Sequence, residues 1–322
     1  MHVFSWIKRV LTAHSYLWRC CWLLGVAGAG VYLPVAAQQR AGERAPQATT
    51  QTNPAQPVDP PAVRTKLFQA ASLKNSFKES EALAAYQEVL KMQPNHYLAL
   101  WQAAELSTKI GTRYTDETRK SAYYDAARRY ADRSLALRPE GGESNYAVAL
   151  ALFNQATLYH AGARLRAFRE LRSHVYLATE RRPDLAEGWA LLGRWQYRVS
   201  HYNVIERIYS KLLLGGVPVG GESRAAMASL EKARALAPHN LQFYYDLARM
   251  CRYQGRRRRA IEVLREAERI TAVTSEDLVI SRLCRQMLPP LLRADTRRQR
   301  RQHRAVSSVV PVPRDSVRAK AE

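Results

Sequence analysis

Four prolines recur along this chain, each at the end of a segment rich in alanine and leucine. They are Pro94, Pro139, Pro183 and Pro238. After each proline, a short polar stretch leads to an aromatic residue and then to Ala and Leu at helical spacing. Because proline ends helices and the pattern then restarts, the chain is predicted to be an array of helical hairpins. Such arrays are usually binding surfaces rather than catalysts.

The last unit of the array fits the tetratricopeptide pattern best. Its matching positions mix bulky and small side chains, and they are Tyr244, Leu247, Ala248, Cys251, Gly255, Ala260, Leu264 and Ala267. Cys251 replaces the usual tyrosine, and Ala272 stands where proline would be. Small residues let two helices approach closely, and large ones fill the space between repeats. We therefore predict an all-α fold, a tetratricopeptide-like superhelix of antiparallel helix hairpins.

The preceding unit carries the same pattern in two separated halves. The first half has Trp189, Leu192 and Gly193, and the second has Ala226, Leu230, Ala233 and Pro238. About 21 extra residues, 200–220, stand between them. The predicted helix pairs are Val63–Asn75 with Glu79–Met92, Tyr97–Ile110 with Asp116–Leu137, Ser144–His160 with Gly162–Glu180, Leu185–Val199 with Ser223–Leu236, and Leu241–Tyr253 with Arg257–Ile270.

The repeat domain is expected to span residues 63–293 and to end in a closing helix, Ser275–Leu288. Thr274 and the acids that follow it form a good helix start, and Pro289-Pro290 are expected to stop the helix. Residues 38–62 are rich in Gln, Thr, Ala and Pro, which predicts a disordered linker. Residues 294–322 are predicted to form a disordered basic tail.

Residues 1–37 have the features of a secretory signal. Three basic residues and no acid lie in residues 1–19, and an apolar stretch of 14 residues follows, Cys20–Leu33. Small residues before Gln38 fit a signal peptidase site, so we expect cleavage after Ala37 and export to a bacterial periplasm or cell envelope. The alternatives are an uncleaved anchor and a start codon placed too early, although a membrane span needs about 20 apolar residues.

Several short motifs resemble those of the regulator of microtubule dynamics family, a tetratricopeptide-like group with many secreted bacterial members. The motifs are residues 193–197 (GRWQY), 214–218 (LGGVP), 229–233 (SLEKA), 238–240 (PHN), Leu247-Ala248 and Gly255. The resemblance covers residues 185–290 well and residues 65–185 only in repeat pattern. It implies the helical repeat fold. Eukaryotic members are microtubule-associated, and some bind lipid, but the expected export argues against microtubules here. No functional residue is carried over from the family.

No catalytic or metal-binding motif stands out. The eight histidines are scattered, without a His-Glu-x-x-His pair. The glycine-rich residues 214–223 have Glu222 where a phosphate loop needs lysine. We therefore predict a protein that is not an enzyme and needs no cofactor or metal. Cys251 and Cys284 could form a disulfide in an exported protein, and the slightly favoured alternative is two buried thiols.

Positive charge is the other strong signal, because the formal net charge is +22. The predicted anionic-surface patch comprises Arg256, Arg257, Arg258, Arg259, Arg297, Arg298, Arg300 and Arg301. Arginine binds carboxylates and phosphates bidentately, so an acidic protein or anionic lipid is a plausible ligand. Nucleic acid is disfavoured because the basic tail has no aromatic residues for stacking. The alternative is that the arginine content reflects an arginine-rich proteome, in which case these side chains only solvate the helix surfaces.

The sequence predicts a scaffold that binds a protein or peptide on the concave face formed by the first helix of each hairpin. The candidate partner-binding residues are Tyr97, Gln102, Asn145, Arg194 and Arg249. One alternative is an anionic membrane-surface or lipid binder acting through the arginine clusters. Another is a lipid-carrying groove near Trp189, Trp195 and Tyr197. The identity of the partner and the oligomeric state stay open.

Overall fold

The computed structural model describes the backbone of residues 59–309 and the side chains up to residue 302, and this part forms one compact unit. Every regular element within it is a helix. The predicted all-α class is therefore confirmed. The predicted signal segment and nearly all of the predicted linker lie outside the described residues.

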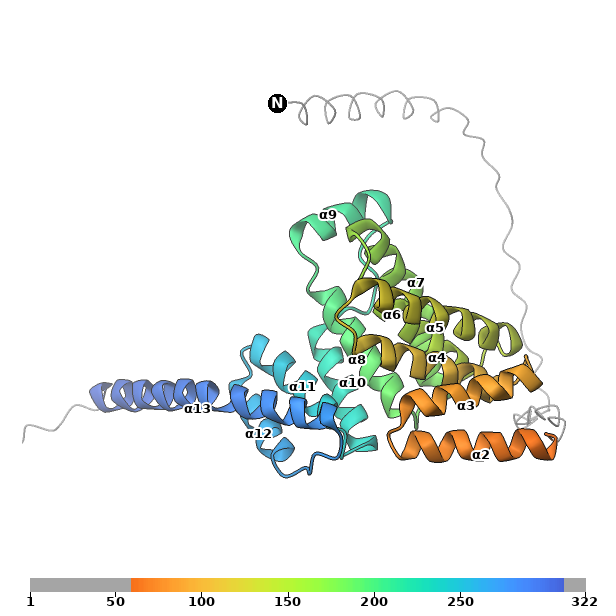
Figure 1. Cartoon of the computed structure of the whole chain (residues 1–322). Helices are drawn as coiled ribbons and strands as arrows, with labels where there is room; N and C mark the ends of the chain where they lie inside the picture. Colours follow the sequence, from red (N-terminus) through yellow and green to blue (C-terminus); the bar gives the residue numbers. More distant parts are fainter. Residues whose placement is uncertain (1–58, 310–322) are drawn as a thin grey trace, which may run out of the picture. The chain divides into compact units, whose positions relative to one another are not determined.

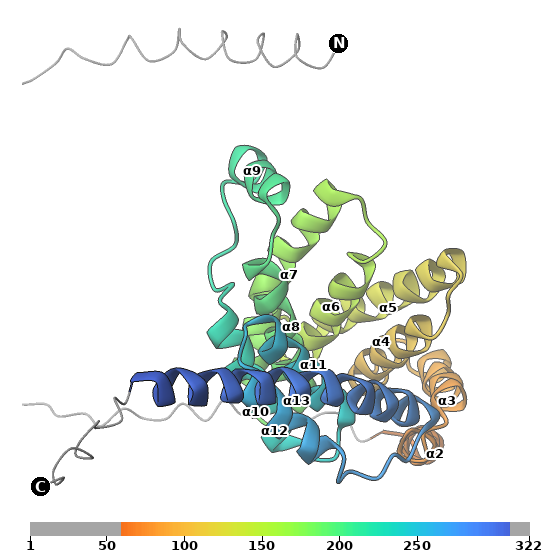
Figure 2. The same cartoon turned by 90° about the vertical axis from the view of Figure 1, so that its left-hand side faces the viewer.

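The helices pair in the predicted order, and Figures 1 and 2 show the hairpins stacked side by side. The pairs are α2 (Pro61–Asn75) with α3 (Glu79–Met92), α4 (Tyr97–Thr112) with α5 (Glu117–Leu137), α6 (Gly142–Gln155) with α7 (Ala161–Arg181), α8 (Ala186–Ser200) with α10 (Ser223–Leu236), and α11 (Leu241–Tyr253) with α12 (Arg257–Ala267). The predicted first helix of the third pair was too long, since α6 ends at Gln155 rather than His160.

The four recurring prolines end helices in the same way. In each case, the residue just before the proline is the C-cap of the preceding helix, with φ between −139° and −131°. A proline ring disfavours helical backbone in the residue before it, which explains this shared extended geometry.

The carbonyl oxygen of each of these prolines accepts a hydrogen bond from a side chain. The donors are Arg133 to Pro94, Asn145 to Pro139 at 2.8 Å, Trp189 to Pro183 at 2.9 Å, and Tyr244 to Pro238 at 2.9 Å. In the last three pairs the donor lies six residues after the proline. These bonds fix the start of each new hairpin against the end of the previous one.

Close approach between paired helices depends on glycine and alanine. A Cβ on Gly193 of α8 would lie 2.9 Å from the carbonyl oxygen of Ala226 and 3.0 Å from Leu230 on α10. Trp195, fully buried on the same helix, donates a hydrogen bond to the carbonyl oxygen of Phe168 at 2.8 Å. Trp195 is therefore part of the core and does not line an open groove with Trp189 and Tyr197.

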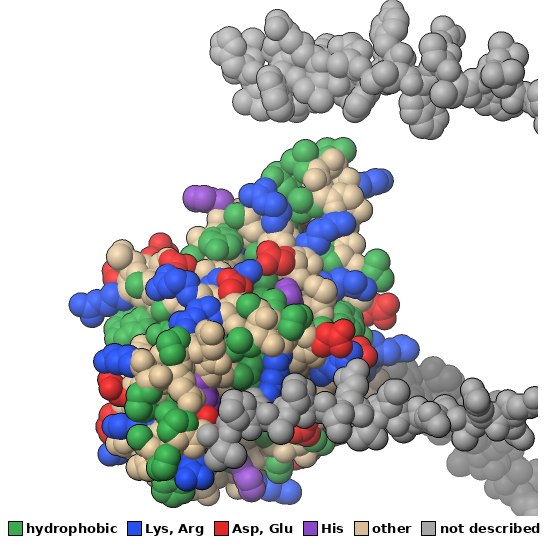
Figure 3. Space-filling view, turned by 90° about the vertical axis from the view of Figure 1, so that its right-hand side faces the viewer, with side chains coloured by type: hydrophobic (Ala, Val, Ile, Leu, Met, Phe, Trp, Pro, Cys, Tyr) green, Lys and Arg blue, Asp and Glu red, His purple; other side chains and the backbone are tan. Residues whose placement is uncertain are grey.

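The extra residues of the fourth hairpin contain a helix of their own, α9 (Val204–Leu213). The side chain of Asn203 accepts a hydrogen bond from the backbone of Glu206, and the side chain of Glu206 accepts one from the backbone of Asn203, which forms a capping box. Figures 1 and 2 show α9 standing away from the stacked hairpins, next to α7. Figure 3 shows hydrophobic and basic side chains together at this end of the unit.

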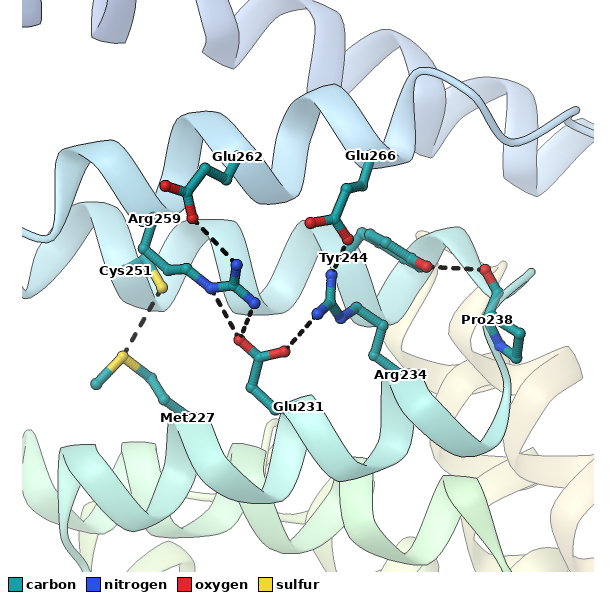
Figure 4. Close-up of polar contacts among 9 residues, drawn as sticks. All are labelled: Met227, Glu231, Arg234, Pro238, Tyr244, Cys251, Arg259, Glu262 and Glu266. Atoms are coloured by element: carbon teal, nitrogen blue, oxygen red, sulfur yellow. Dashed lines mark hydrogen bonds and ion pairs between the residues drawn. The ribbon is translucent and has the colours of Figure 1, made fainter.

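Ion pairs tie α10 to the last hairpin, as Figure 4 shows. Glu231 accepts from Arg259 at 2.6 Å and from Arg234 at 2.7 Å, and Arg234 also pairs with Glu266. Arg259, predicted as part of the anionic-surface patch, is thus engaged within the fold.

The closing helix differs from the prediction. Helix α13 runs from Ser275 to Val309 with both prolines inside it, so the predicted stop at Pro289-Pro290 is wrong, and residues 294–309 of the predicted tail lie in this helix. Met287, Leu288 and Leu291 are buried in the core beside the exposed prolines. Burying each such side chain contributes roughly 1.5–3 kcal/mol, which offsets a proline cost of about 3 kcal/mol. None of the described helices is both long enough and apolar enough to span a bilayer.

Cys251 and Cys284, the two cysteines in the described part of the chain, give a first test of this packing. Both are free and buried, and Cys251 Sγ lies 3.8 Å from Met227 Sδ. Burial raises the pKa of both thiols, that of Cys284 to about 11. Thiolates are the reactive form, so both cysteines should resist iodoacetamide at about pH 8 and react fully in denaturant. Rapid labelling of the native protein would contradict the packing.

Two glycines of α8 give a matched test of the close helix contact. Gly193→Ala should destabilise the fold by about 1–3 kcal/mol, because the added methyl group meets the backbone of α10. Gly188→Ala should be neutral or stabilise the fold by up to about 1 kcal/mol, since its nearest neighbour atom would be at an ordinary 3.7 Å. Urea unfolding of both variants measures the difference. Equal stability of the two variants would contradict the helix contact.

Candidate functional site

Tyr97 and Asn145, two of the predicted partner-binding residues, are buried between hairpins and bonded within the fold, so their prediction as surface residues is wrong. The Tyr97 hydroxyl donates to Glu143 at 3.2 Å and accepts from the backbone nitrogen of Ser144 at 3.2 Å. Asn145 donates to the carbonyl oxygens of Pro139 and Gly141, at 2.8 Å each. Tyr97 and Asn145 therefore build the start of α6.

The other three predicted residues have different surroundings. Gln102 is mostly buried and accepts a hydrogen bond from Lys74 Nζ at 2.7 Å, but it still lines a pocket. Arg194 pairs with Asp246 at 2.7 Å, which links α8 to α11. Arg249 is exposed, with its guanidinium 5.5 Å from the Tyr245 ring centre. The structure does not bring these five residues together into one site.

Two adjoining pockets lie mainly on α2 and α4, the first helices of their hairpins, with further lining residues from α3 and α8. The first, of about 460 Å³, is largely apolar and lined by Leu67, Phe68, Ala71, Lys74, Asn75, Tyr86, Leu98 and Gln102. The second, of about 480 Å³, is charged and lined by Lys74, Asn75, Phe77, Glu79, Glu105, Leu106, Lys109 and Glu187. They share Lys74 and Asn75 and so lie next to each other, and we call them together the joined pockets.

Lys74, at the end of α2, sits where the two pockets meet. Its Nζ donates to Glu105 at 2.5 Å and to Gln102 at 2.7 Å, and it lies 5.7 Å from the Trp101 ring centre. These contacts hold the ammonium over α4. The apolar side of the joined pockets thus ends at a fixed positive charge.

Glu79 and Glu187, two carboxylates that line the charged pocket, differ in their ion pairs and in the direction of their pKa shifts. Burial raises the pKa of Glu79, but ion pairs with Lys109 at 2.9 Å and Arg113 at 3.1 Å reverse this, so its pKa is lowered overall. Glu187 makes no ion pair with any described residue, and burial raises its pKa with help from the charge of Glu105. Glu187 is therefore a half-buried carboxylate without a cation of its own.

Phe77 is the one non-glycine residue with positive φ among those described, at 59°. It ends α2 in a Schellman turn, with the backbone nitrogen of Lys78 bonded to the carbonyl oxygen of Leu73. Gly255 holds the same place in the last hairpin, at φ 70°. A left-handed conformation costs a side chain about 1–2 kcal/mol, and such strain tends to occur at functional sites. The half-exposed Phe77 ring lines the charged pocket.

A third pocket, of about 470 Å³, gathers part of the predicted anionic-surface patch. Its lining residues come from α12 and α13 and include five arginines: Arg257, Arg293, Arg297, Arg298 and Arg301. No acidic residue lines it. Arg256 and Arg300 are exposed outside it, and Arg258 lies 3.8 Å from Asp295. Arg293 was not among the eight arginines of the predicted patch, although it begins the same basic stretch of sequence.

Among the residues that the structure describes, no group of three or more His, Cys, Asp or Glu side chains could hold a metal ion. The joined pockets were not predicted from the sequence. Phe68 and Phe77 are large aromatic residues outside the repeat pattern, but their exposure can be recognised only once the phase of the helices is known.

The chain resembles known proteins over most of its helical part. Regulator of microtubule dynamics protein 3 of Mus musculus is 25% identical over 223 residues, which are 67% of this chain and 46% of the mouse protein. The protein of the same name from Rattus norvegicus is 25% identical over 179 residues, 55% of this chain and 38% of the rat protein. The chain spans less than half the length of either relative.

A solved structure of a thermophilic TPR protein from Thermus thermophilus aligns with a TM-score of 0.50 at 18% identity, covering 71% of this chain and 98% of that one. This likeness concerns the fold. The sequence model of the family called Regulator of microtubule dynamics protein 1-3 matches residues 67–292, which confirms the resemblance seen in the motifs. The chain belongs to this family.

Proposed function

We propose that this protein is a non-enzymatic scaffold whose helical array binds a segment of a partner protein in the joined pockets. The observation that carries the proposal is the pairing of exposed apolar side chains with an unpaired, half-buried carboxylate in these two neighbouring pockets. Phe68 is 80% exposed and Leu98 is 42% exposed, so both are free to contact a ligand.

The lining residues suggest what the partner segment contains. An apolar side chain would fill the first pocket against Leu67, Phe68 and Leu98. A lysine or arginine would reach Glu187 in the second pocket, where a charge-assisted hydrogen bond is stronger than a neutral one. The preferred segment is therefore an aliphatic or aromatic residue followed closely by a basic one. The partner is proposed to be met outside the cytoplasm, because residues 1–37 have the features of an export signal.

The arginine-lined pocket favours a second candidate function, binding of an anionic surface. Five guanidinium groups without a lining carboxylate repel one another, and an anionic ligand would relieve this repulsion. Such binding would weaken steeply with salt, because the groups are exposed and screened within about 10 Å at 0.1 M.

Selection of peptides tests the first candidate. Residues 58–322, which hold the whole described core, would be screened against a random displayed peptide library, and selected peptides measured by fluorescence anisotropy. The double variant Phe68→Ser/Leu98→Ser should weaken their binding at least about tenfold, because two apolar contacts are lost. The control Val273→Ser/Leu278→Ser, at 70% and 54% exposed positions outside both pockets, should bind normally. Undiminished binding by the first variant would overturn the proposal.

The pH dependence of the same binding tests Glu187. Its raised pKa means that it takes up a proton at higher pH than an ordinary glutamate, whereas a basic peptide favours its charged form. Affinity should therefore fall as the pH is lowered from neutral to acidic, through the raised pKa of Glu187. Glu187→Gln should bind about tenfold more weakly at the higher pH and show much less pH dependence. The idea fails if wild type and Glu187→Gln give the same pH profile.

A further inference from the structure

Helix α9 faces the opposite way to an ordinary surface helix. Its polar residues Glu206 and Ser210 are buried against the domain, at 6% and 1% exposure. Its apolar residues point to solvent, with exposed fractions of 72% for Val204, 77% for Ile205, 53% for Ile208, 75% for Leu212 and 65% for Leu213. A helix on a soluble domain normally buries its apolar stripe. Here that stripe has no partner among the described residues.

Specific contacts fix this orientation. Glu206 pairs with Arg198 of α8 at 2.5 Å and closes the capping box with Asn203. Ser210 Oγ donates to the carbonyl oxygen of Gly216 at 2.7 Å. The hydroxyl of Tyr209 would lie 2.6 Å from a Cβ on Gly162 of α7, so a larger residue there would push α9 away. The polar face of α9 is thus anchored, and the apolar face is held outward.

Basic side chains lie along one edge of the apolar stripe and beside the loop that follows α9. Arg207 and Lys211 are exposed on α9 itself, beside Val204 on the helical wheel. On α7, Arg169 donates to the carbonyl oxygen of Gly216 and Arg172 to that of Val219, which places both arginines next to the loop that leaves α9. The only acid of α9 is the buried, paired Glu206. Figure 3 shows basic side chains beside the hydrophobic ones at this end of the unit.

We propose that α9 docks this protein on an anionic lipid membrane surface. Its aliphatic side chains would enter the boundary between headgroups and acyl chains, and the neighbouring basic side chains would meet the lipid phosphates and carboxylates. Interfacial helices combine a high amphipathicity with basic residues in this way.

Charge decides against a second copy of the chain as the occupant. A symmetric pair formed through α9 would bring Arg207 and Lys211 of one copy close to the same residues of the other, and like charges in contact are unfavourable. An anionic bilayer instead offers an apolar layer beneath a negative one, in the arrangement that the apolar stripe and its basic border require. The proposal does not depend on peptide binding, and its surface is distinct from the arginine-lined pocket.

Co-sedimentation with lipid vesicles tests the proposal. Residues 58–322 would be mixed with vesicles of phosphatidylcholine alone and of phosphatidylcholine with about one third phosphatidylserine. The wild type should bind the anionic vesicles at least about tenfold more tightly. Ile205→Asp/Leu212→Asp should lose most of this binding, whereas Val273→Asp/Leu278→Asp, with equal added charge at exposed positions elsewhere, should retain more of it. Circular dichroism would check that both variants are folded.

Two further arms separate the alternatives. Arg297→Glu/Arg298→Glu alters the arginine-lined pocket and should leave more binding than Arg207→Glu/Lys211→Glu does. If the α13 variant alone abolishes binding, or if the two aspartate variants bind equally, the proposal is overturned. Light scattering completes the test, since a dimer that Ile205→Asp/Leu212→Asp dissociates would assign the α9 face to a second copy instead.

Discussion

The whole array depends on one recurring contact, in which a proline that ends one hairpin gives its carbonyl oxygen to a side chain of the next hairpin. Asn145, Trp189 and Tyr244 each make this bond from the sixth residue after the proline. The proline stops the incoming helix, and the bond sets where the following helix begins. In the first repeat the sixth residue is Leu100, which cannot donate, and Arg133 of the neighbouring helix bonds to Pro94 instead. The hairpin register is therefore kept even where the sequence pattern is degenerate.

A frame fixed in this way leaves three surfaces that packing does not explain. The joined pockets combine a strained aromatic, Phe77, with the unpaired Glu187. The arginine-lined pocket concentrates positive charge on α12 and α13. Helix α9 turns its apolar residues outward. Each feature costs the isolated domain stability through strain, repulsion or exposed apolar area, and a ligand of the matching chemistry would relieve the repulsion and cover the apolar area.

The sequence predicted the hairpins well because proline and small residues act locally. Gly193 has to be small because two helices meet there, and the residues before the prolines are restricted to extended backbone. Both requirements can be recognised in the sequence without a structure. The site could not be predicted in the same way. Asn145 looked like a surface residue, but its place six residues after Pro139 makes it the counterpart of Trp189 and Tyr244. Pro289-Pro290 did not end α13, because burial of Leu291 depends on tertiary packing. Glu187 gained its raised pKa from helices distant in sequence.

The central claim is that the joined pockets are where this array holds its partner. Hydrogen–deuterium exchange of residues 58–322, with and without a peptide selected by binding, tests this most directly. We expect slower exchange in the last turn of α2, in α4 and in the first turn of α8, with α12 and α9 unchanged. Slower exchange confined to α12 and α13, or to α9, would contradict it and would move the partner-binding site to the arginine-lined pocket or to the insert.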